Sequence, residues 1–432
     1  MGATVETFGQ AVRRLRGHRS LRDLARSTHI DPGHLSRIEA DKRPPTPVTA
    51  AALDKELNAH GALAALMAAP QLDPWQLDRA DWRPQDSERL AATITEQLPA
   101  AENAVELAHQ WLIAEPPQVY EMRAGRRVGI ATVEEVERRL QRLRLLDDHI
   151  GGARTHAIVT AELAATARLL RDGAYTEALG RRLLVAVGEL CQVAGWVTSD
   201  TGRHADAQRL YLLGVRASHA GGDIAGAANN LSSLAYQVSN VGDPREGARL
   251  ARSAYAGARR AASATTRALL AERVAWAHAR TGEAGGAARA LATVETEYDG
   301  RRAEDDPTWV YWLDEDEIQI MAGRVWTQLR RPLQAVPLLE RAVAGYGEET
   351  GRETALYLSW LAESLLQANE VERAAEVATR ALRLSRQADS ARADDRIAIV
   401  RCKLAAFRGN AAADAFEDEA CAVSDPTTPP PP

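Results

Sequence analysis

A spacing of about 40 residues repeats through the second half of the chain. Turn-forming triplets centred on Gly202, Gly242, Gly282, Arg330 and Asn369 stand 40, 40, 48 and 39 residues apart. Small residues recur at three fixed offsets from each centre. Seven residues before it stand Gly195, Ala235, Ala275, Gly323 and Ala362, and five residues after it stand Ala207, Gly247, Ala287, Ala335 and Ala374. Twelve residues after it stand Gly214, Ala254, Val294, Ala342 and Ala381, of which one is a valine. Such a period predicts helical hairpins that stack and share one continuous core.

The composition supports an all-α fold. Aromatic residues make up 5% of the 432 residues, and the apolar content comes largely from Ala and Leu, which favour helices. A chain of this length is expected to form more than one domain. The repeats resemble the tetratricopeptide family, with longer periods, and we expect a tetratricopeptide-like α-solenoid over residues 156–420.

This resemblance implies that the first helix of each hairpin lines a concave groove. The inward positions are polar or aromatic, and the amides are expected to hold an extended peptide or another effector. The candidate groove residues are Gln192, Trp196, Asn229, Ser232, Tyr236, Asn240, Trp276, Arg280, Arg324 and Gln328, with Glu189, Glu272, Glu317, Ser359, Glu363 and Gln367 beside them. The alternative is that these side chains form the hydrated face of a solenoid.

Residues 305–320, DDPTWVYWLDEDEIQI, account for the longest interval between turns. Their aromatic and acidic side chains have two interpretations. They form a site for a cationic ligand, or the aromatics belong to the core of a longer helix whose acids face solvent. We expect the second.

Three short helices are predicted near the N-terminus. Thr7 to Gln10 has the form of a capping box and opens a helix that ends near Gly17. Ser20 to Asp23 repeats the capping pattern for a second helix. Asp31-Pro32 combines an N-cap with proline at the first helical position, and so begins a third helix that ends before residue 42.

The second and third helices have the spacing of a helix-turn-helix motif. Its anchor positions are Ala25, His29, Ile30, Leu35 and Ile38, with His29 expected at positive φ. FGQAVRRLRGHRSLRDLARSTHIDPGHLSRIEADKRPPTP resembles the phage-repressor-like, or Xre-type, helix-turn-helix family over residues 7–67. The resemblance implies that the third helix enters the major groove of double-stranded DNA.

The candidate base readers lie early in that third helix. Arg37 suits guanine, and Ser36 and His34 are expected to assist, whereas Pro32 and Gly33 have no side-chain donors. Ser20, Arg22, Lys42 and Arg43 are expected to hold phosphates. The predicted DNA-binding residues are Ser20, Arg22, Asp31, Gly33, His34, Ser36, Arg37, Lys42 and Arg43.

Charge and motif content narrow the function further. Residues 1–60 hold ten basic and seven acidic side chains, whereas the whole chain has a net charge of −6. The sequence has no phosphate loop, G-x-S-x-G or H-E-x-x-H motif, so no enzyme, metal or cofactor is expected. No signal peptide or apolar run of membrane-spanning length is found, and a cytoplasmic location is expected.

The predicted organisation is a helix-turn-helix domain over residues 1–69, a linker with connecting helices over 70–155, the solenoid, and a disordered Pro-rich tail over 421–432. The whole resembles peptide-responsive bacterial regulators and, more closely, the long Xre-type regulators of actinobacteria. This resemblance implies a homodimeric transcriptional regulator controlled by a ligand. The alternative is a tetratricopeptide adaptor for other proteins whose N-terminal head does not read DNA.

Overall fold

The computed structural model describes residues 7–28, 30–40, 45–59, 61, 63, 104–113, 126–150, 152–346, 351–388 and 391–421. The chain divides into two compact units, Met1–Gln76 and Leu77–Pro432. The described part is all-α apart from one pair of two-residue strands, which confirms the predicted fold class. Residues 64–69 of the predicted helix-turn-helix domain, residues 70–103 of the predicted linker and residues 422–432 of the predicted tail lie outside the described residues.

The first unit contains four described helices: α1 (Phe8–Arg16), α2 (Leu21–Thr28), α3 (Pro32–Glu39) and α4 (Pro47–Glu56). The capping box at Thr7 forms as predicted, because its hydroxyl accepts from the Gln10 amide and the Gln10 side chain accepts from the Thr7 amide. Helix α1 ends at Gly17, whose φ of 57° favours glycine. The helices share one core: Ala11, Val12, Leu24, Ala25, Leu35, Leu53, Ala59 and Leu63.

The second unit begins, in its described part, with α7 (Ala104–Ile113), α8 (Ile130–Ile150) and α9 (Gly152–Asp172). Strands β1 (Arg126–Arg127) and β2 (Gly173–Ala174) pair in parallel, with Arg126 opposite Gly173. Trp111 of α7 lies against the backbone of α13, since a Cβ atom on Gly257 would come within 2.3 Å of its ring. A glycine is therefore required for this close approach.

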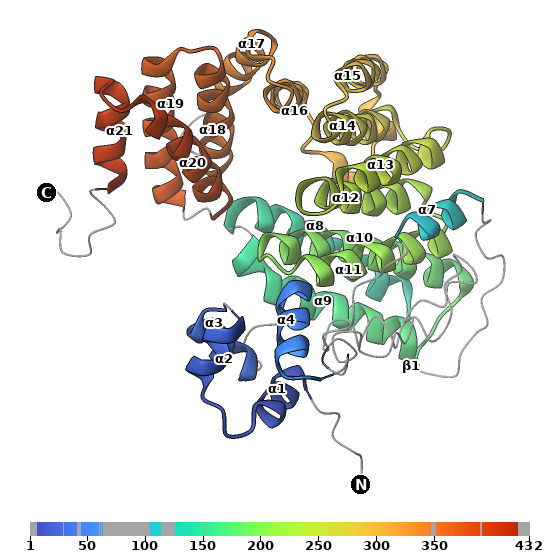
Figure 1. Ribbon diagram of the computed structural model, residues 1–432. Helices are drawn as coiled ribbons and strands as arrows, with labels where there is room; N and C mark the ends of the chain where they lie inside the picture. The colour runs from blue at the N-terminus through green and yellow to red at the C-terminus, as the bar shows by residue number, and fades with distance from the viewer. Residues whose placement is uncertain are drawn as a thin grey trace, which may run out of the picture. The chain divides into compact units, whose positions relative to one another are not determined.

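Pairs of helices then follow one another along the chain, from green α10 to orange-red α19 in Figure 1. Each pair also contacts the first helix of the next pair. The pairs are α10 (Glu177–Asp200) with α11 (His204–Gly221), α12 (Ile224–Val241) with α13 (Pro244–Ala258), α14 (Ala264–Thr281) with α15 (Ala284–Asp299), α16 (Glu315–Gln328) with α17 (Pro332–Val343), and α18 (Gly351–Gln367) with α19 (Val371–Ala388).

All five predicted turns lie between the two helices of a pair. Gly202, Gly282, Arg330 and Asn369 have positive φ, whereas Gly242 does not. The small residues at fixed offsets are buried where the helices meet. At Gly195, for example, a Cβ atom would come within 2.6 Å of the Tyr211 ring on the partner helix. The repeat pattern is thus confirmed as an all-helical solenoid.

The segment before α16 corrects one expectation. It does not extend a helix but forms two 3₁₀ turns, η1 (Ala303–Asp305) and η2 (Thr308–Val310). Trp309 and Val310 are buried in a cluster with residues of α14 and α16, so the aromatic part does join the core. A longer helix is prevented because Asp314 caps α16, accepting from the Glu317 amide at 2.8 Å.

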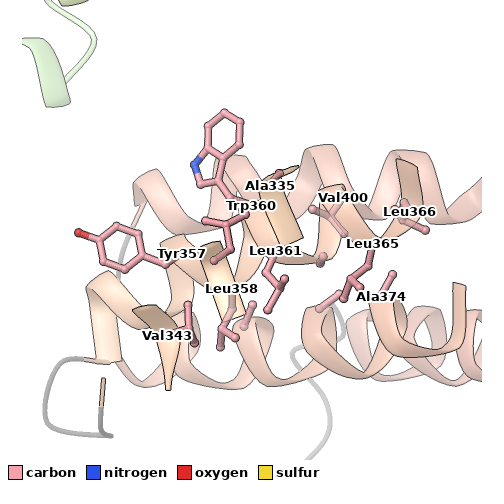
Figure 2. Packing of buried hydrophobic residues seen from close by; sticks show 14 of the residues in the cluster. Ala335, Val343, Tyr357, Leu358, Trp360, Leu361, Leu365, Leu366, Ala374 and Val400 are labelled. Carbon is pink, nitrogen blue, oxygen red and sulfur yellow. The ribbon is translucent and has the colours of Figure 1, made fainter. Parts of the chain in front are cut away.

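The last described elements are α20 (Ala391–Leu404), η4 (Ala405–Phe407) and α21 (Ala411–Cys421). They pack on α18 and α19 and continue the core of the last pair. Figure 2 shows Leu358, Leu361 and Leu365 of α18 inside this core, whereas the indole of Trp360 leaves α18 in another direction. Within the described residues, no helix combines the length and apolar character needed to cross a bilayer.

Candidate functional site

Two short helices, α2 and α3, form the part of the first unit that the sequence assigns to DNA. Ser20 begins α2, because its hydroxyl accepts from the Asp23 amide at 3.1 Å. Asp31 begins α3 and accepts from the His34 amide at 2.8 Å. Leu24, Ala25, Leu35 and Ile38 are buried beneath the two helices. The capped ends and the buried apolar stripe fix which face of α3 points outward.

The outward face of α3 carries the predicted base readers. Gly33, Ser36 and Arg37 are exposed, and His34 is half-buried. Arg37 is exposed and forms no ion pair with any residue that the structure describes. A guanidinium presented on such a face suits the O6 and N7 acceptors of guanine in the major groove.

The predicted phosphate contacts are only partly within the described chain. Ser20 and Arg22 are exposed at the start of α2, and Asp31 is exposed at the start of α3. The Ser20 hydroxyl donates to the Asp23 carboxylate at 2.6 Å, so the groups that favour an anion at this helix N-terminus are its first backbone amides. Lys42 and Arg43, together with the turn residue His29, lie outside the described residues.

A buried ion pair in this unit was not predicted. Glu39 at the end of α3 is 5% exposed, and its two carboxylate oxygens accept from Arg16 of α1 at 2.5 and 3.1 Å. This hydrogen bond raises the pKa of the Arg16 guanidinium above its ordinary value. The sequence holds one signal for it, because Glu39 follows Leu35 by four residues and therefore lies on the apolar face of α3.

A second ion pair joins the α1–α2 connection to α4. Arg19 contacts the Glu56 carboxylate at 2.7 Å, and its guanidinium also donates to the Ser27 hydroxyl of α2 at 2.7 Å. The backbone oxygen of Arg19 in turn accepts from Arg16. Together with the Arg16–Glu39 pair, these contacts hold α1, α2, α3 and α4 in one arrangement and set the position of α3.

Comparison with known families agrees with this geometry. Residues 7–67 match the family model of a helix-turn-helix domain. This part of the chain is a helix-turn-helix domain. Such a domain supports a role as a DNA-binding regulator. Comparisons of the chain with curated proteins and with solved structures find no match.

The candidate ligand residues of the second unit lie on its first helices. We call the surface formed by α10, α12, α14, α16, α18 and α20 the first-helix face, because each of these helices contacts the next one in this series. Five candidates occupy the same position, six residues before the middle of each turn: Trp196, Tyr236, Trp276, Arg324 and Glu363. The structure brings these five together from five helices.

Many polar side chains of the first-helix face already bond to one another. Trp276 donates to the Asn240 side chain at 3.0 Å, and Gln192 donates to Ser233 at 3.2 Å. Arg280 donates to the backbone oxygen of Ser239 at 3.0 Å and to the Gln328 side chain at 3.3 Å. Ser232 and Asn229 are buried, at 1% and 9% exposed. These contacts tie α10, α12, α14 and α16 to one another.

The carboxylates on this face have different partners. Glu272 pairs with Arg273 at 3.0 Å, and Glu363 pairs with Arg396 at 2.6 Å. Glu317 accepts a hydrogen bond from the Tyr357 hydroxyl and is 9% exposed. Burial raises the pKa of the Glu317 carboxyl to about 7, although the Tyr357 hydroxyl and the charge of Arg324 act in the opposite direction.

Proposed function

We propose that the chain is an Xre-type transcriptional regulator that reads double-stranded DNA with α3. The observation that carries the proposal is the exposed guanidinium of Arg37, which stands on the outer face of α3 above a buried stripe, in a domain that matches the helix-turn-helix model. Arg37 reads guanine, with Ser36 and His34 beside it. Ser20, Arg22, Lys42 and Arg43 hold phosphates and set the position of the domain on the duplex.

The same face of α3 supports binding as a homodimer. Pro32 and Gly33 take up reading positions without side-chain donors, so one α3 helix makes few base contacts. Two heads on one duplex double the number of contacts and match two half-sites. The second unit, a tetratricopeptide-like solenoid in this proposal, supplies the pairing surface.

The second unit is further proposed to sense an effector on the first-helix face. The aromatic and charged side chains collected there from six helices support this role. An effector that binds them changes the packing of successive pairs and hence the spacing of two heads. The protein is in this account a cytoplasmic regulator of the actinobacterial type that binds rather than catalyses.

Selection of bound duplexes from a random DNA library, performed with the full chain at two salt concentrations, tests the proposal. An enriched motif with two half-sites is expected, and its enrichment should be weaker at the higher salt concentration because phosphate contacts release counterions. No enrichment at either salt concentration would overturn the proposal and would favour a protein-binding adaptor. An enriched motif with a single half-site would retain DNA reading but contradict the dimer.

A further inference from the structure

Aromatic rings follow one another across the first-helix face. The centroids of Trp196 and Tyr236 lie 6.0 Å apart, those of Tyr236 and Trp276 6.1 Å, and those of Trp276 and Trp360 5.9 Å. These rings come from α10, α12, α14 and α18. Centroid separations in this range are those of favourable aromatic pairs.

Three arginines lie over these rings. The guanidinium of Arg396 is 3.5 Å from the centroid of Trp360, and that of Arg273 is 4.6 Å from the centroid of Tyr236. Arg324 lies among three rings, at 5.1 Å from Trp276, 5.3 Å from Trp360 and 5.8 Å from Tyr236. We call Tyr236, Trp276, Trp360, Arg273, Arg324 and Arg396 the arginine–aromatic cluster.

Two of the three arginines are neutralised by a carboxylate, and one is not. Arg273 pairs with Glu272, and Arg396 pairs with Glu363. Arg324 has no carboxylate within ion-pair distance among the described residues, and its hydrogen bond goes to the hydroxyl of Tyr236. A guanidinium has five N–H donors, so most of its donors have no acceptor in the described part of the chain.

Arg324 is therefore a half-buried cation with no carboxylate in hydrogen-bond contact among the described residues, although, against the effect of burial, the charges of Glu272 and Glu317 act on it and raise its pKa. Its Nε is buried and finds no acceptor among the described residues, as is also true of Arg273 and Arg396, so the missing carboxylate is what sets Arg324 apart. Aromatic faces attract a cation, but they accept no strong hydrogen bonds from its N–H groups. A carboxylate or phosphate, in contrast, takes two parallel hydrogen bonds from one guanidinium.

We propose that Arg324 binds the oxyanion of a small organic ligand, a carboxylate or phosphate carried by a flat ring that packs against the half-buried rings of Trp196 and Tyr236. Trp276 and Trp360, at 3% and 8% exposed, are buried. The inference rests on the sensing role proposed above and names the class of effector. A flat ring fits because Trp196 and Tyr236, both half-buried, already stack at an angle of 23°. A small ligand fits better than a peptide, because the Asn240 and Gln192 side chains are already hydrogen-bonded to Trp276 and Ser233.

Calorimetric titration of the full chain with matched probes tests this assignment. Benzoate and phenyl phosphate carry the oxyanion on a ring, benzamide is the neutral match, and acetate and inorganic phosphate lack the ring. We expect one or both ring anions to bind about tenfold or more tightly than benzamide, because the hydrogen bonds from Arg324 are charge-assisted. Tighter binding of benzoate would indicate a carboxylate ligand, and tighter binding of phenyl phosphate would indicate a phosphate ligand. Acetate and inorganic phosphate should bind more weakly than the corresponding ring anions.

Substitutions assign the binding to Arg324. Arg324→Gln should reduce the affinity for the ring anion to that for benzamide, and Arg324→Lys should lose part of it because an ammonium group cannot bind bidentately. Arg245→Gln, on the exposed start of α13, is the matched control and should bind as the wild type does. Circular dichroism of each variant checks that it is folded. If Arg324→Gln is not folded, the affinity of Arg324→Lys for the ring anion shows whether Arg324 binds it.

Two results would overturn the proposal. One is that neither ring anion binds the wild type more tightly than benzamide, and the other is that the folded Arg324 variants bind the anions unchanged. Because the titration contains no DNA, either result leaves the DNA-binding proposal intact. Conversely, a failed DNA selection would remove the regulator without affecting anion binding at Arg324.

Discussion

Arg37 is the side chain on which sequence reading depends in this account, because α3 exposes few other donors. Arg37→Ala should lower the discrimination between the selected and a shuffled duplex by about 1–3 kcal/mol. Lys42→Ala is the matched control: it should weaken binding to both duplexes and reduce the slope of log affinity against log salt by about one. Titration of labelled duplexes measures both effects. Unchanged discrimination in Arg37→Ala would assign reading to another residue.

The buried pair of Glu39 and Arg16 should stabilise the helix-turn-helix domain. Glu39→Gln leaves the Arg16 guanidinium, whose side chain is 17% exposed, without its anion and should cost about 3 kcal/mol. Hydrogen exchange of α1 and α3 amides in the full chain measures the loss. Arg26→Gln breaks the exposed pair with Asp23 and should cost less than about 1 kcal/mol. Equal effects of the two substitutions would contradict the structural role of Glu39.

Glu317 should make the stability of the second unit depend on pH. Its folded pKa of about 7 lies above the ordinary 4.5, so the folded state holds the proton more tightly than the unfolded state. Stability is then greatest below about pH 4.5 and falls as the pH rises through about 7, by up to about 3 kcal/mol.

Glu317→Gln imitates the neutral acid and retains an acceptor for the Tyr357 hydroxyl. Its advantage over the wild type should be small at about pH 5 and should grow to about 3 kcal/mol at about pH 8. Urea unfolding at the two pH values gives the difference. An advantage that stays the same at both values would show that Glu317 ionises normally in the folded protein.

At the scale of elements, small residues allow the two helices of a pair to approach. Gly195→Ala should destabilise the α10–α11 pair by about 1–3 kcal/mol, because the new Cβ atom would meet the buried Tyr211 ring at 2.6 Å. Gly285→Ala on α15 is the control: its nearest neighbour is the Arg289 guanidinium at 3.5 Å, and a gain of up to about 1 kcal/mol is expected. Thermal unfolding separates the two. Destabilisation by both would show that packing at Gly195 is not the cause.

Elements of this chain are predictable from sequence where local chemistry decides them. The capping box at Thr7 and the five turns between paired helices depend on neighbouring residues, and the structure confirms them. The 3₁₀ turns before α16 were missed because an aromatic and acidic run fits a helix equally well. There, tertiary burial of Trp309 decides the outcome.

Contacts between distant residues set the limit of sequence reasoning. Arg16 and Glu39 are 23 residues apart, and Arg324 and Tyr236 are 88 apart. Their meeting depends on how helices cross, which local patterns do not specify. Sequence periodicity placed Tyr236, Trp276 and Arg324 on one face, but the arginine–aromatic cluster and the lack of a carboxylate partner for Arg324 emerge only from the structure.

At the scale of the whole molecule, the two units present different features. The first unit has the geometry of a helix-turn-helix domain, and the second gathers charged and aromatic side chains on the first-helix face. An effector bound to the first-helix face is expected to change the affinity for DNA by a coupling free energy of about 1–3 kcal/mol. This requires that effector and DNA both favour the same arrangement of the two helix-turn-helix domains in a dimer.

The most direct test is the affinity of the full chain for its selected duplex and for a shuffled duplex of equal length, measured at two salt concentrations. The selected duplex should bind more tightly at both concentrations, and the affinity for each duplex should fall as the salt concentration increases. Equal affinity for the two duplexes, or affinity that does not respond to salt, would contradict the assignment of this chain as a sequence-specific DNA-binding regulator.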